Sequence, residues 1–179
     1  PYNWTGLYMD NDLSYPYVTT NQKKAGSRSV EMYPKLGAPI YLVSPKLNVE
    51  DIANVRFSFS VYHTAAYDRA VTVGIVSDIN NIVNTFVPID TIIFNKDMGW
   101  MTAEYIVGDY YQGSAKYIAF KGDDELNASL NASNKNGAQF YIDDVSIEEL
   151  PSCRYPENVL LKSITTNSVT VSFTNPGKA

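Results

Sequence analysis

Apolar and polar side chains alternate strictly through residues 55–64. Successive residues of a strand point to opposite faces of a sheet, so one face of this segment is apolar and the other is polar. The apolar face carries Val55, Phe57, Phe59 and Val61, and the polar face carries Arg56, Ser58, Ser60, Tyr62 and Thr64. A two-residue period is typical of an antiparallel strand with one face in the core and the other in water. We therefore expect a half-buried antiparallel strand here.

Other segments repeat this pattern, whereas helix signals are limited to single turns such as the one after Asp78. Val71, Val73 and Ile75 alternate again, and Gly74 between them predicts a close backbone approach. Pro88 lies inside a strand candidate, which predicts an edge position or a bulge. The remaining strand candidates of the main part of the chain are residues 28–33, 40–43, 86–94, 101–107, 116–121 and 139–148. The pattern predicts an all-β fold, a jelly-roll β-sandwich of two antiparallel sheets.

The balance of charge argues against two classes of partner. The 179 residues include 14 basic and 19 acidic side chains, for a formal net charge of −5. A surface that binds nucleic acid needs clustered Lys and Arg, so we expect no nucleic-acid partner. The sequence has no run of about 18 apolar residues, so we expect no membrane insertion.

Residues that commonly perform catalysis are scarce. The chain has one His and one Cys, and it contains neither an H-E-x-x-H nor a G-x-S-x-G motif. His63 lies two residues after Val61, so the alternation of this strand places it on the buried face. This position predicts a structural, hydrogen-bonded imidazole. Cys153 has no second Cys for a disulfide, and we interpret it as a small hydrophobe or a boundary residue, with a thiol close to His63 as the open alternative. We predict that the chain is not an enzyme.

The composition changes at residues 150–156, which contain Pro151 and Pro156. Two prolines so close together predict a stiff, extended linker over residues 151–156. Beyond the linker, residues 158–161 and 168–173 are strand candidates, so we expect a short C-terminal β-hairpin. About twenty residues cannot bury a core of their own. We therefore interpret residues 1–150 as the main domain and residues 157–179 as the truncated start of a further domain.

Four ordered motifs resemble one known family. They are YLVSPKL at residues 41–47, VRFSFSV at 55–61, TFVPIDT at 85–91 and FYIDDV at 140–145. Together they look like the MAM-like jelly-roll domains of the cleaved-adhesin or choice-of-anchor type in bacterial surface proteins. The segment PENVLLKSITTNSVTVSF at residues 156–173 is similar to the opening of a fibronectin type III domain, with Phe173 where such domains usually carry a Trp.

The resemblance implies a secreted or cell-surface bacterial protein with several domains. In such proteins a module of this type serves adhesion or carbohydrate binding. The implied partners are a carbohydrate or a host extracellular protein, together with neighbouring domains of the same full-length protein. Two alternatives are a structural spacer and an accessory domain of a secreted hydrolase. We expect a non-catalytic binding or adhesion module.

The resemblance also implies a structural Ca²⁺ between the N-terminal loop and the last strand of the sandwich. By this resemblance, the candidate ligands are Asp10, Asp12, Asp143 and Asp144. Ca²⁺ prefers six to eight oxygen ligands, and a carboxylate among apolar neighbours must be paired, hydrogen-bonded or metal-bound. The alternative is that Asp143 accepts hydrogen bonds from backbone N–H groups of a loop.

Aromatic residues are the better guide to a ligand, and the chain contains 14 tyrosines. Sugar rings have apolar C–H faces that stack on Tyr and Trp, and the Tyr hydroxyl adds a polar contact. We predict ligand-binding roles for Trp100, Tyr105, Tyr110 and Tyr111, with Tyr62 and Tyr67 as further candidates. The alternative is that these tyrosines rim the sandwich with their hydroxyls in water. Four aromatic residues near the N-terminus are expected to anchor the chain start, namely Trp4, Tyr8, Tyr15 and Tyr17.

Overall fold

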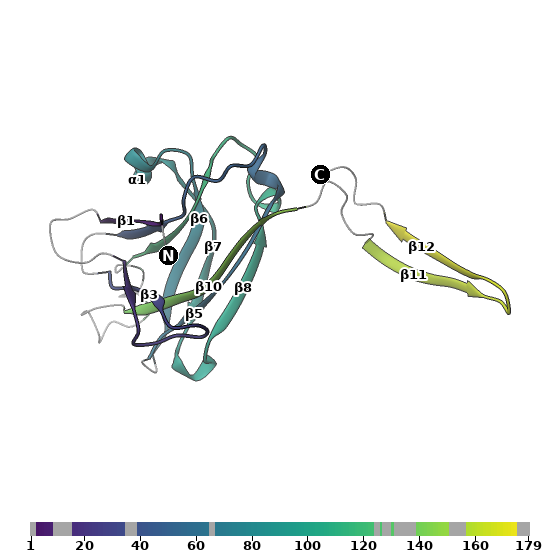
Figure 1. The fold of residues 1–179 in the computed structure, drawn as a ribbon, viewed down its shortest axis with the longest axis horizontal. Coiled ribbons are helices and arrows are strands. Elements are labelled where there is room, and N and C mark those ends of the chain that lie inside the picture. Colours follow the sequence, from purple (N-terminus) through teal and green to yellow (C-terminus); the bar gives the residue numbers. More distant parts are fainter. Residues whose placement is uncertain are drawn as a thin grey trace.

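Two five-stranded antiparallel sheets form the body of the molecule in the computed structural model (Figure 1). The structure describes residues 3–8, 16–34, 39–64, 67–123, 126, 130, 139–150 and 157–174. Sheet A has the order β1 (Thr5–Tyr8), β4 (Ile40–Val43), β9 (Tyr117–Gly122), β6 (Arg69–Val76) and β7 (Phe86–Phe94). Sheet B has the order β2 (Tyr17–Thr19), β3 (Ser29–Met32), β10 (Phe140–Glu149), β5 (Val55–Tyr62) and β8 (Met101–Ile106). The predicted jelly-roll β-sandwich is confirmed.

The chain passes repeatedly from one sheet to the other, and short helical turns lie in several of the connections between strands. From β3 to β10, every connection except the one between β6 and β7 changes sheet. The turn η1 (Ile52–Asn54) begins after Asp51, and η2 (Ile79–Asn81) begins after Asp78; each Asp side chain accepts a hydrogen bond from a backbone N–H of its turn. The turns η3 (Lys96–Met98) and η4 (Val107–Asp109) flank β8, and the α-helical turn α1 (Ile82–Thr85) precedes β7. None of the described helical segments is long and apolar enough to cross a membrane.

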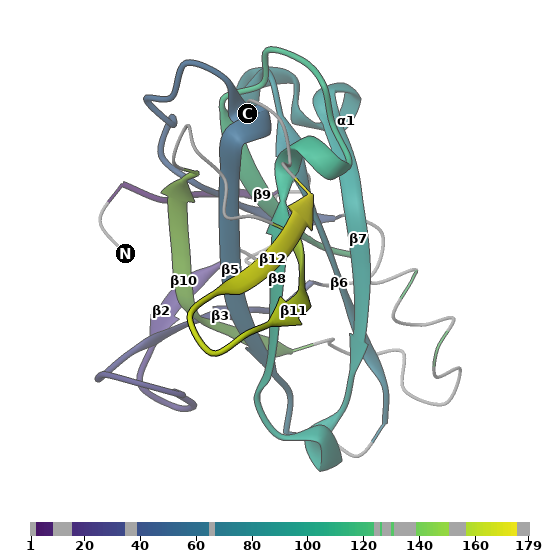
Figure 2. The same ribbon diagram turned by 90° about the vertical axis from the view of Figure 1, so that its right-hand side faces the viewer.

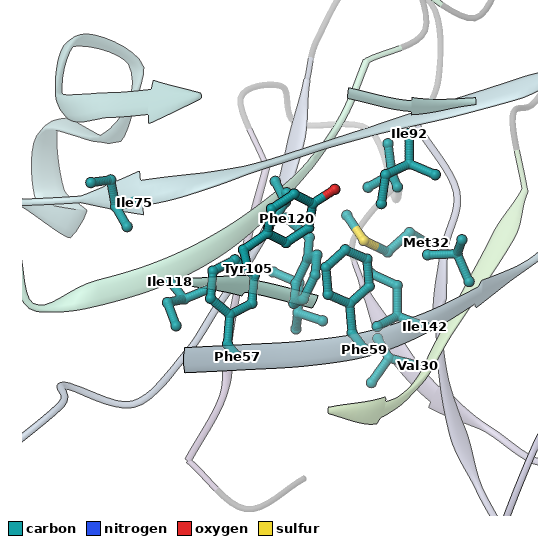
Figure 3. Close-up of a cluster of buried hydrophobic side chains, with 14 of the residues drawn as sticks. Val30, Met32, Phe57, Phe59, Ile75, Ile92, Tyr105, Ile118, Phe120 and Ile142 are labelled. Carbon is teal, nitrogen blue, oxygen red and sulfur yellow. The ribbon is translucent and has the colours of Figure 1, made fainter. Parts of the chain in front are cut away.

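The core lies between the sheets and is rich in stacked aromatic rings (Figure 3). Phe57 and Phe59 from β5 point inward, as the alternating pattern predicted, and their ring centroids lie 6.1 Å apart. Phe59 meets Phe120 of sheet A edge-on at 4.7 Å between centroids. Burial of these rings and of the Val and Ile side chains around them supplies the main force that holds the two sheets together.

Sheet A contains one irregularity that the sequence predicted. Val73 of β6 pairs with Asp90 of β7, whereas the next residue, Gly74, pairs with Pro88. Ile89 is therefore the extra residue of a bulge in the edge strand β7. A Cβ atom at Gly74 would lie 2.3 Å from the backbone oxygen of Val87, so the predicted close backbone approach is confirmed.

A separate two-stranded sheet follows, made of β11 (Glu157–Ile164) and β12 (Val169–Thr174). This pairing agrees with the predicted C-terminal hairpin. Its described side chains from residue 158 to 174 are all exposed except the half-buried Ser172. The hairpin includes seven large exposed apolar side chains, namely Val159, Leu160, Leu161, Ile164, Val169, Val171 and Phe173. The linker residues 151–156, Cys153 among them, lie outside the described part of the chain.

Candidate functional site

Four aromatic side chains and one carboxylate form a continuous row across the outer face of sheet B, whose strands β10, β5 and β8 lie next to one another (Figure 2). Phe140, Ile142 and Val61 are in the core, so their chain neighbours Tyr141 and Tyr62 point outward. Direct strand pairing then aligns Tyr17 with Glu31, Glu31 with Tyr141 and Tyr141 with Tyr62. Trp100 precedes β8 at the point where Met101 pairs with Val61. We call this set the aromatic row: Tyr17, Glu31, Tyr141, Tyr62 and Trp100.

The rings of the aromatic row are stacked side by side. The centroids of Trp100 and Tyr62 lie 5.3 Å apart, and those of Tyr62 and Tyr141 lie 6.5 Å apart, with 29° between the planes in each pair. Trp100 and Tyr62 are half-buried, and Tyr17 is 41% exposed. Tyr141 is only 3% exposed and forms the base of the row. Tyr17 at one end and Tyr62 with Trp100 at the other are therefore accessible, whereas Glu31 and Tyr141 between them are buried.

Glu31 is a buried carboxylate within the aromatic row, with 2% of its surface exposed. It accepts hydrogen bonds from the Tyr17 hydroxyl and the Gln139 side-chain amide, and a longer one of 3.4 Å from the Asn21 amide. All three donors are uncharged. Burial, followed by the charge of Glu31, raises the pKa of Tyr141 to about 12. The Tyr141 phenol is therefore protonated at neutral pH.

A polar network lies beside the aromatic row. Its residues Asp143, Ser60 and Thr102 are each two positions from a residue of the row on the same strand or at its start. Asp143 accepts hydrogen bonds through Oδ2 from the backbone N–H groups of Lys24 (2.7 Å) and Ala25 (3.2 Å). The Lys24 ammonium group donates to the hydroxyls of Ser60 and Thr102, at 2.9 Å each. These contacts hold residues 20–28, the loop between β2 and β3, over the outer face of sheet B. The 20–28 loop therefore forms one wall beside the aromatic row.

The four aromatic residues predicted to bind a ligand do not lie together. Trp100 belongs to the aromatic row at one end of β8, whereas Tyr105, Tyr110 and Tyr111 lie at or beyond the other end. Tyr105 is 8% exposed and its ring stacks on Phe57, with centroids 5.4 Å apart, so it is part of the core. Tyr110 is 53% exposed and packs edge-on against Tyr105, while Tyr111 is half-buried against the core.

The hydroxyl of Tyr105 has a structural partner. It donates a hydrogen bond of 2.6 Å to Oδ2 of Asp90 on β7, which links the edge strands of the two sheets. Burial and the neighbouring Asp90 carboxylate raise the pKa of Tyr105 well above its usual range. With its ring stacked in the core and its hydroxyl bonded to Asp90, Tyr105 offers no free face to a sugar.

Trp100 and Tyr62 of the aromatic row were predicted as ligand-binding candidates from the sequence, whereas Tyr141, Tyr17 and Glu31 were not. The alternating pattern of the last strand places Tyr141 opposite the core residues Phe140 and Ile142, and that pattern was visible in the sequence. Its alignment with Tyr62 and Glu31 depends on strand register between segments far apart in the chain, which a single sequence does not encode in a readable way. Tyr17 was expected to anchor the chain start, and Glu31 carried no signal that distinguishes it from other acidic residues.

The predicted calcium ligands are only partly within the described structure. Asp10 and Asp12 lie outside it, and the described residues contain no group of three or more His, Cys, Asp or Glu side chains that could hold a metal ion. Asp143 accepts three backbone N–H groups, those of Lys24, Ala25 and Asp144, as the alternative to calcium foresaw. Asp144 lies 3.6 Å from the Lys24 ammonium group. These donors are poor surroundings for a cation, so the described contacts favour the alternative, and the calcium site stays a prediction. Equal melting temperatures with excess Ca²⁺ and with a chelator would rule it out.

No protein-family model and no curated protein matches the sequence. Among solved structures, the K1 cleaved-adhesin domain of Lys-gingipain from Porphyromonas gingivalis W83 is similar, with a TM-score of 0.58 and 17% identity over 84% of this chain and 93% of that one. The K2 cleaved-adhesin domain of Lys-gingipain has a TM-score of 0.56 and 14% identity over 83% and 89%. A family 11 carbohydrate-binding module from Clostridium thermocellum, solved with a β-1,3-1,4-mixed-linked tetrasaccharide, has a TM-score of 0.51 and 13% identity over 84% and 91%. The chain thus has the β-sandwich fold found in adhesin and carbohydrate-binding modules.

Proposed function

We propose that this chain is a non-catalytic binding module of an exported multidomain bacterial protein, and that it holds a carbohydrate chain along the aromatic row. The observation that carries the proposal is the alignment of Tyr17, Tyr141, Tyr62 and Trp100 at paired positions on neighbouring strands. The partly exposed rings of Trp100, Tyr62 and Tyr17 suit sugars, which present both C–H faces and hydroxyl groups. The likeness to adhesin and carbohydrate-binding modules supports the same function class.

The geometry favours a linear glycan that runs across the strands. The aromatic row crosses the five strands of sheet B, so it spans four inter-strand steps of about 4.8 Å, or roughly 19 Å. The 20–28 loop, anchored by Asp143 and Lys24, limits how far a bound ligand extends along the strands. A linear chain of several sugar units would contact Trp100 and Tyr62 at one end and Tyr17 at the other, over the buried Tyr141 and Glu31.

The charges at the aromatic row favour an uncharged glycan. Among its described contacts, Glu31 accepts hydrogen bonds from neutral donors only. A sugar carrying a carboxylate or a sulfate would approach this buried negative charge without a cation between them, which is unfavourable at short range. We therefore expect neutral glycans to bind and acidic ones to bind more weakly.

The proposal is tested with a glycan array followed by calorimetry on the glycans that bind. We expect Trp100→Ala and Tyr62→Ala to weaken binding about tenfold or more, because each removes part of a stacking surface. Tyr110→Ala is the matched control, since Tyr110 is an exposed Tyr at the opposite end of β8. Loss of binding in Tyr110→Ala with unchanged binding in Trp100→Ala would place the site elsewhere. Absence of glycan binding together with capture of extracellular-matrix proteins would favour a protein partner, and absence of both would favour a spacer.

A further inference from the structure

A cavity of about 610 Å³ penetrates the sandwich beside β10, away from the aromatic row. Its inner part is bounded by Trp4 and Leu42, which belong to the sheet A side of the sandwich. Its walls come from sheet B and include Val18, Val30, Ile142 and Val145. Cavities of roughly 300–1,000 Å³ are typical of small-molecule sites, whereas well-packed cores contain few voids larger than a water molecule.

An irregularity in β10 makes room for this cavity. β10 pairs with β3 only from Phe140 to Ile142, although on its other side it continues to pair with β5 as far as Glu149. The β5 register shifts between Asp143 and Ser146, and Asp144 has a positive φ of 50°. β3 begins at Ser29, so its pairing with β10 ends next to this bulge. Asp143, Asp144 and Val145 of the bulge line the cavity together with Trp4.

The interior of the cavity is apolar and includes one aromatic ring. One side of the Trp4 indole stacks on Phe120, with centroids 6.1 Å apart and 25° between the planes. The remaining wall residues named above are aliphatic, so they offer no hydrogen-bond donor or acceptor from their side chains. The lining also includes the polar residues Arg28, Ser29, Asp143 and Asp144, so an apolar ligand body fits the part of the cavity next to Trp4 and the aliphatic side chains.

The mouth of the cavity carries one cation without a described partner. The mouth also carries two carboxylates: Asp143 accepts hydrogen bonds from three backbone N–H groups, and Asp144 lies 3.6 Å from the Lys24 ammonium group. The positive charges of Lys24 and Arg28 balance these two negative charges. Arg28 also lines the cavity, and it makes no hydrogen bond or ion pair with any residue in the described part of the chain. A guanidinium group binds a carboxylate through two parallel hydrogen bonds.

We propose that this cavity is a binding site for a small amphipathic carboxylate. The apolar body of the ligand lies between Trp4 and the aliphatic walls, and its carboxylate pairs with Arg28 at the mouth. The site shares no residue with the aromatic row, although Arg28 belongs to the 20–28 loop and Asp143 anchors that loop beside the row. Trp4 and Val18 line only the cavity, so variants at these two positions test it separately from the carbohydrate surface.

The two Trp residues of the chain allow each site to be observed alone. In the Trp100→Phe variant, Trp4 is the single Trp and reports on the cavity. We expect decanoate to shift the Trp4 emission to shorter wavelength in a saturable manner, because the ligand replaces water beside the indole. Decanoate does not absorb in this range, so binding at the exposed hairpin would leave the Trp4 signal unchanged. In the Trp4→Phe variant, Trp100 reports on glycan binding at the aromatic row.

Two variants in the Trp100→Phe background test the walls and the mouth. Val18→Phe fills the cavity from the edge strand β2 and is expected to weaken decanoate binding at least tenfold. Val87→Phe, an equally exposed position on the edge strand β7, is the matched control. Arg28→Gln is expected to weaken decanoate about tenfold and to leave decanol, the uncharged analogue, unchanged. Unchanged Trp4 emission with decanoate, full affinity in Val18→Phe, or equal effects of Arg28→Gln on both probes would each overturn the proposal.

Discussion

His63 is a buried imidazole whose surroundings disfavour its charged form. The ring is 3% exposed, lies 5.3 Å from the Tyr67 ring between centroids, and interacts with a backbone group of Gln139. The predicted burial is therefore confirmed. Burial and, to a smaller extent, the nearby Arg69 lower the pKa of His63 to about 4. The imidazole is neutral at physiological pH.

We predict that acidification destabilises the fold through His63. The unfolded chain binds a proton near pH 6.5, but the folded chain does so only near pH 4, so the free energy of unfolding falls as the pH drops between these values. Between pH 7 and pH 5 the loss is about 2 kcal/mol. Urea unfolding at both pH values measures it. His63→Phe keeps an aromatic ring beside Tyr67 and removes the titration, so an equal pH dependence in this variant would contradict the prediction.

At the scale of single elements, the close contact between β6 and β7 requires that residue 74 is a glycine, with no side chain. We predict that Gly74→Ala destabilises the protein by roughly 2–4 kcal/mol, because its Cβ would lie 2.3 Å from the Val87 backbone oxygen and 2.8 Å from the Phe86 ring. Gly113→Ala is the control, since a Cβ there meets only the end of the Tyr111 side chain, which can move. Urea unfolding of both variants tests the prediction. A cost at Gly74 no larger than the cost at Gly113 would count against it.

The 20–28 loop is a second element whose position depends on one side chain. We predict that Asp143→Ala releases the loop, because the variant loses the acceptor for the backbone N–H groups of Lys24 and Ala25. Trypsin should then cleave after Lys23 or Lys24 several times faster. Asp144→Asn is the control, since asparagine tolerates the positive φ of residue 144 and the substitution leaves the Asp143 hydrogen bonds intact. Equal rates of cleavage in Asp143→Ala and the unmodified protein would show that other contacts hold the loop.

Local patterns predicted elements well and predicted the site poorly. The alternation in residues 55–64 and the glycine at position 74 depend on interactions with immediate neighbours, so β5 and the close contact of β6 with β7 were visible in the sequence. The edge strands β1 and β2 were missed: β2 has only three residues, and β1 contains Gly6, which weakens a strand pattern. Tyr105 was predicted to bind a ligand, but its ring faces inward and its hydroxyl donates a hydrogen bond to Asp90. Those contacts are made by residues on other strands.

At the scale of the whole molecule, the sandwich and the C-terminal hairpin are unequal in their packing. The sandwich buries a continuous core, whereas the described side chains of the hairpin remain exposed on both of its faces. We predict that a chain ending at Leu150 melts within about 2 °C of the full chain, because the hairpin contributes little buried surface to the sandwich. Differential scanning calorimetry measures both. A fall of 5 °C or more would show that the hairpin or the linker stabilises the sandwich.

The order of strands has a consequence for how the chain reaches its final state. β9 lies between β4 and β6, and β10 lies between β3 and β5, so the last two strands of the sandwich occupy interior positions in both sheets. Neither sheet can close until these late segments are available, and most pairings join residues far apart in sequence. A ribosome that has delivered β1 to β8 therefore holds two incomplete sheets with open edges. Proteins of such high contact order fold in milliseconds to seconds. During that interval the open strand edges expose the chain to pairing and aggregation with other copies of itself.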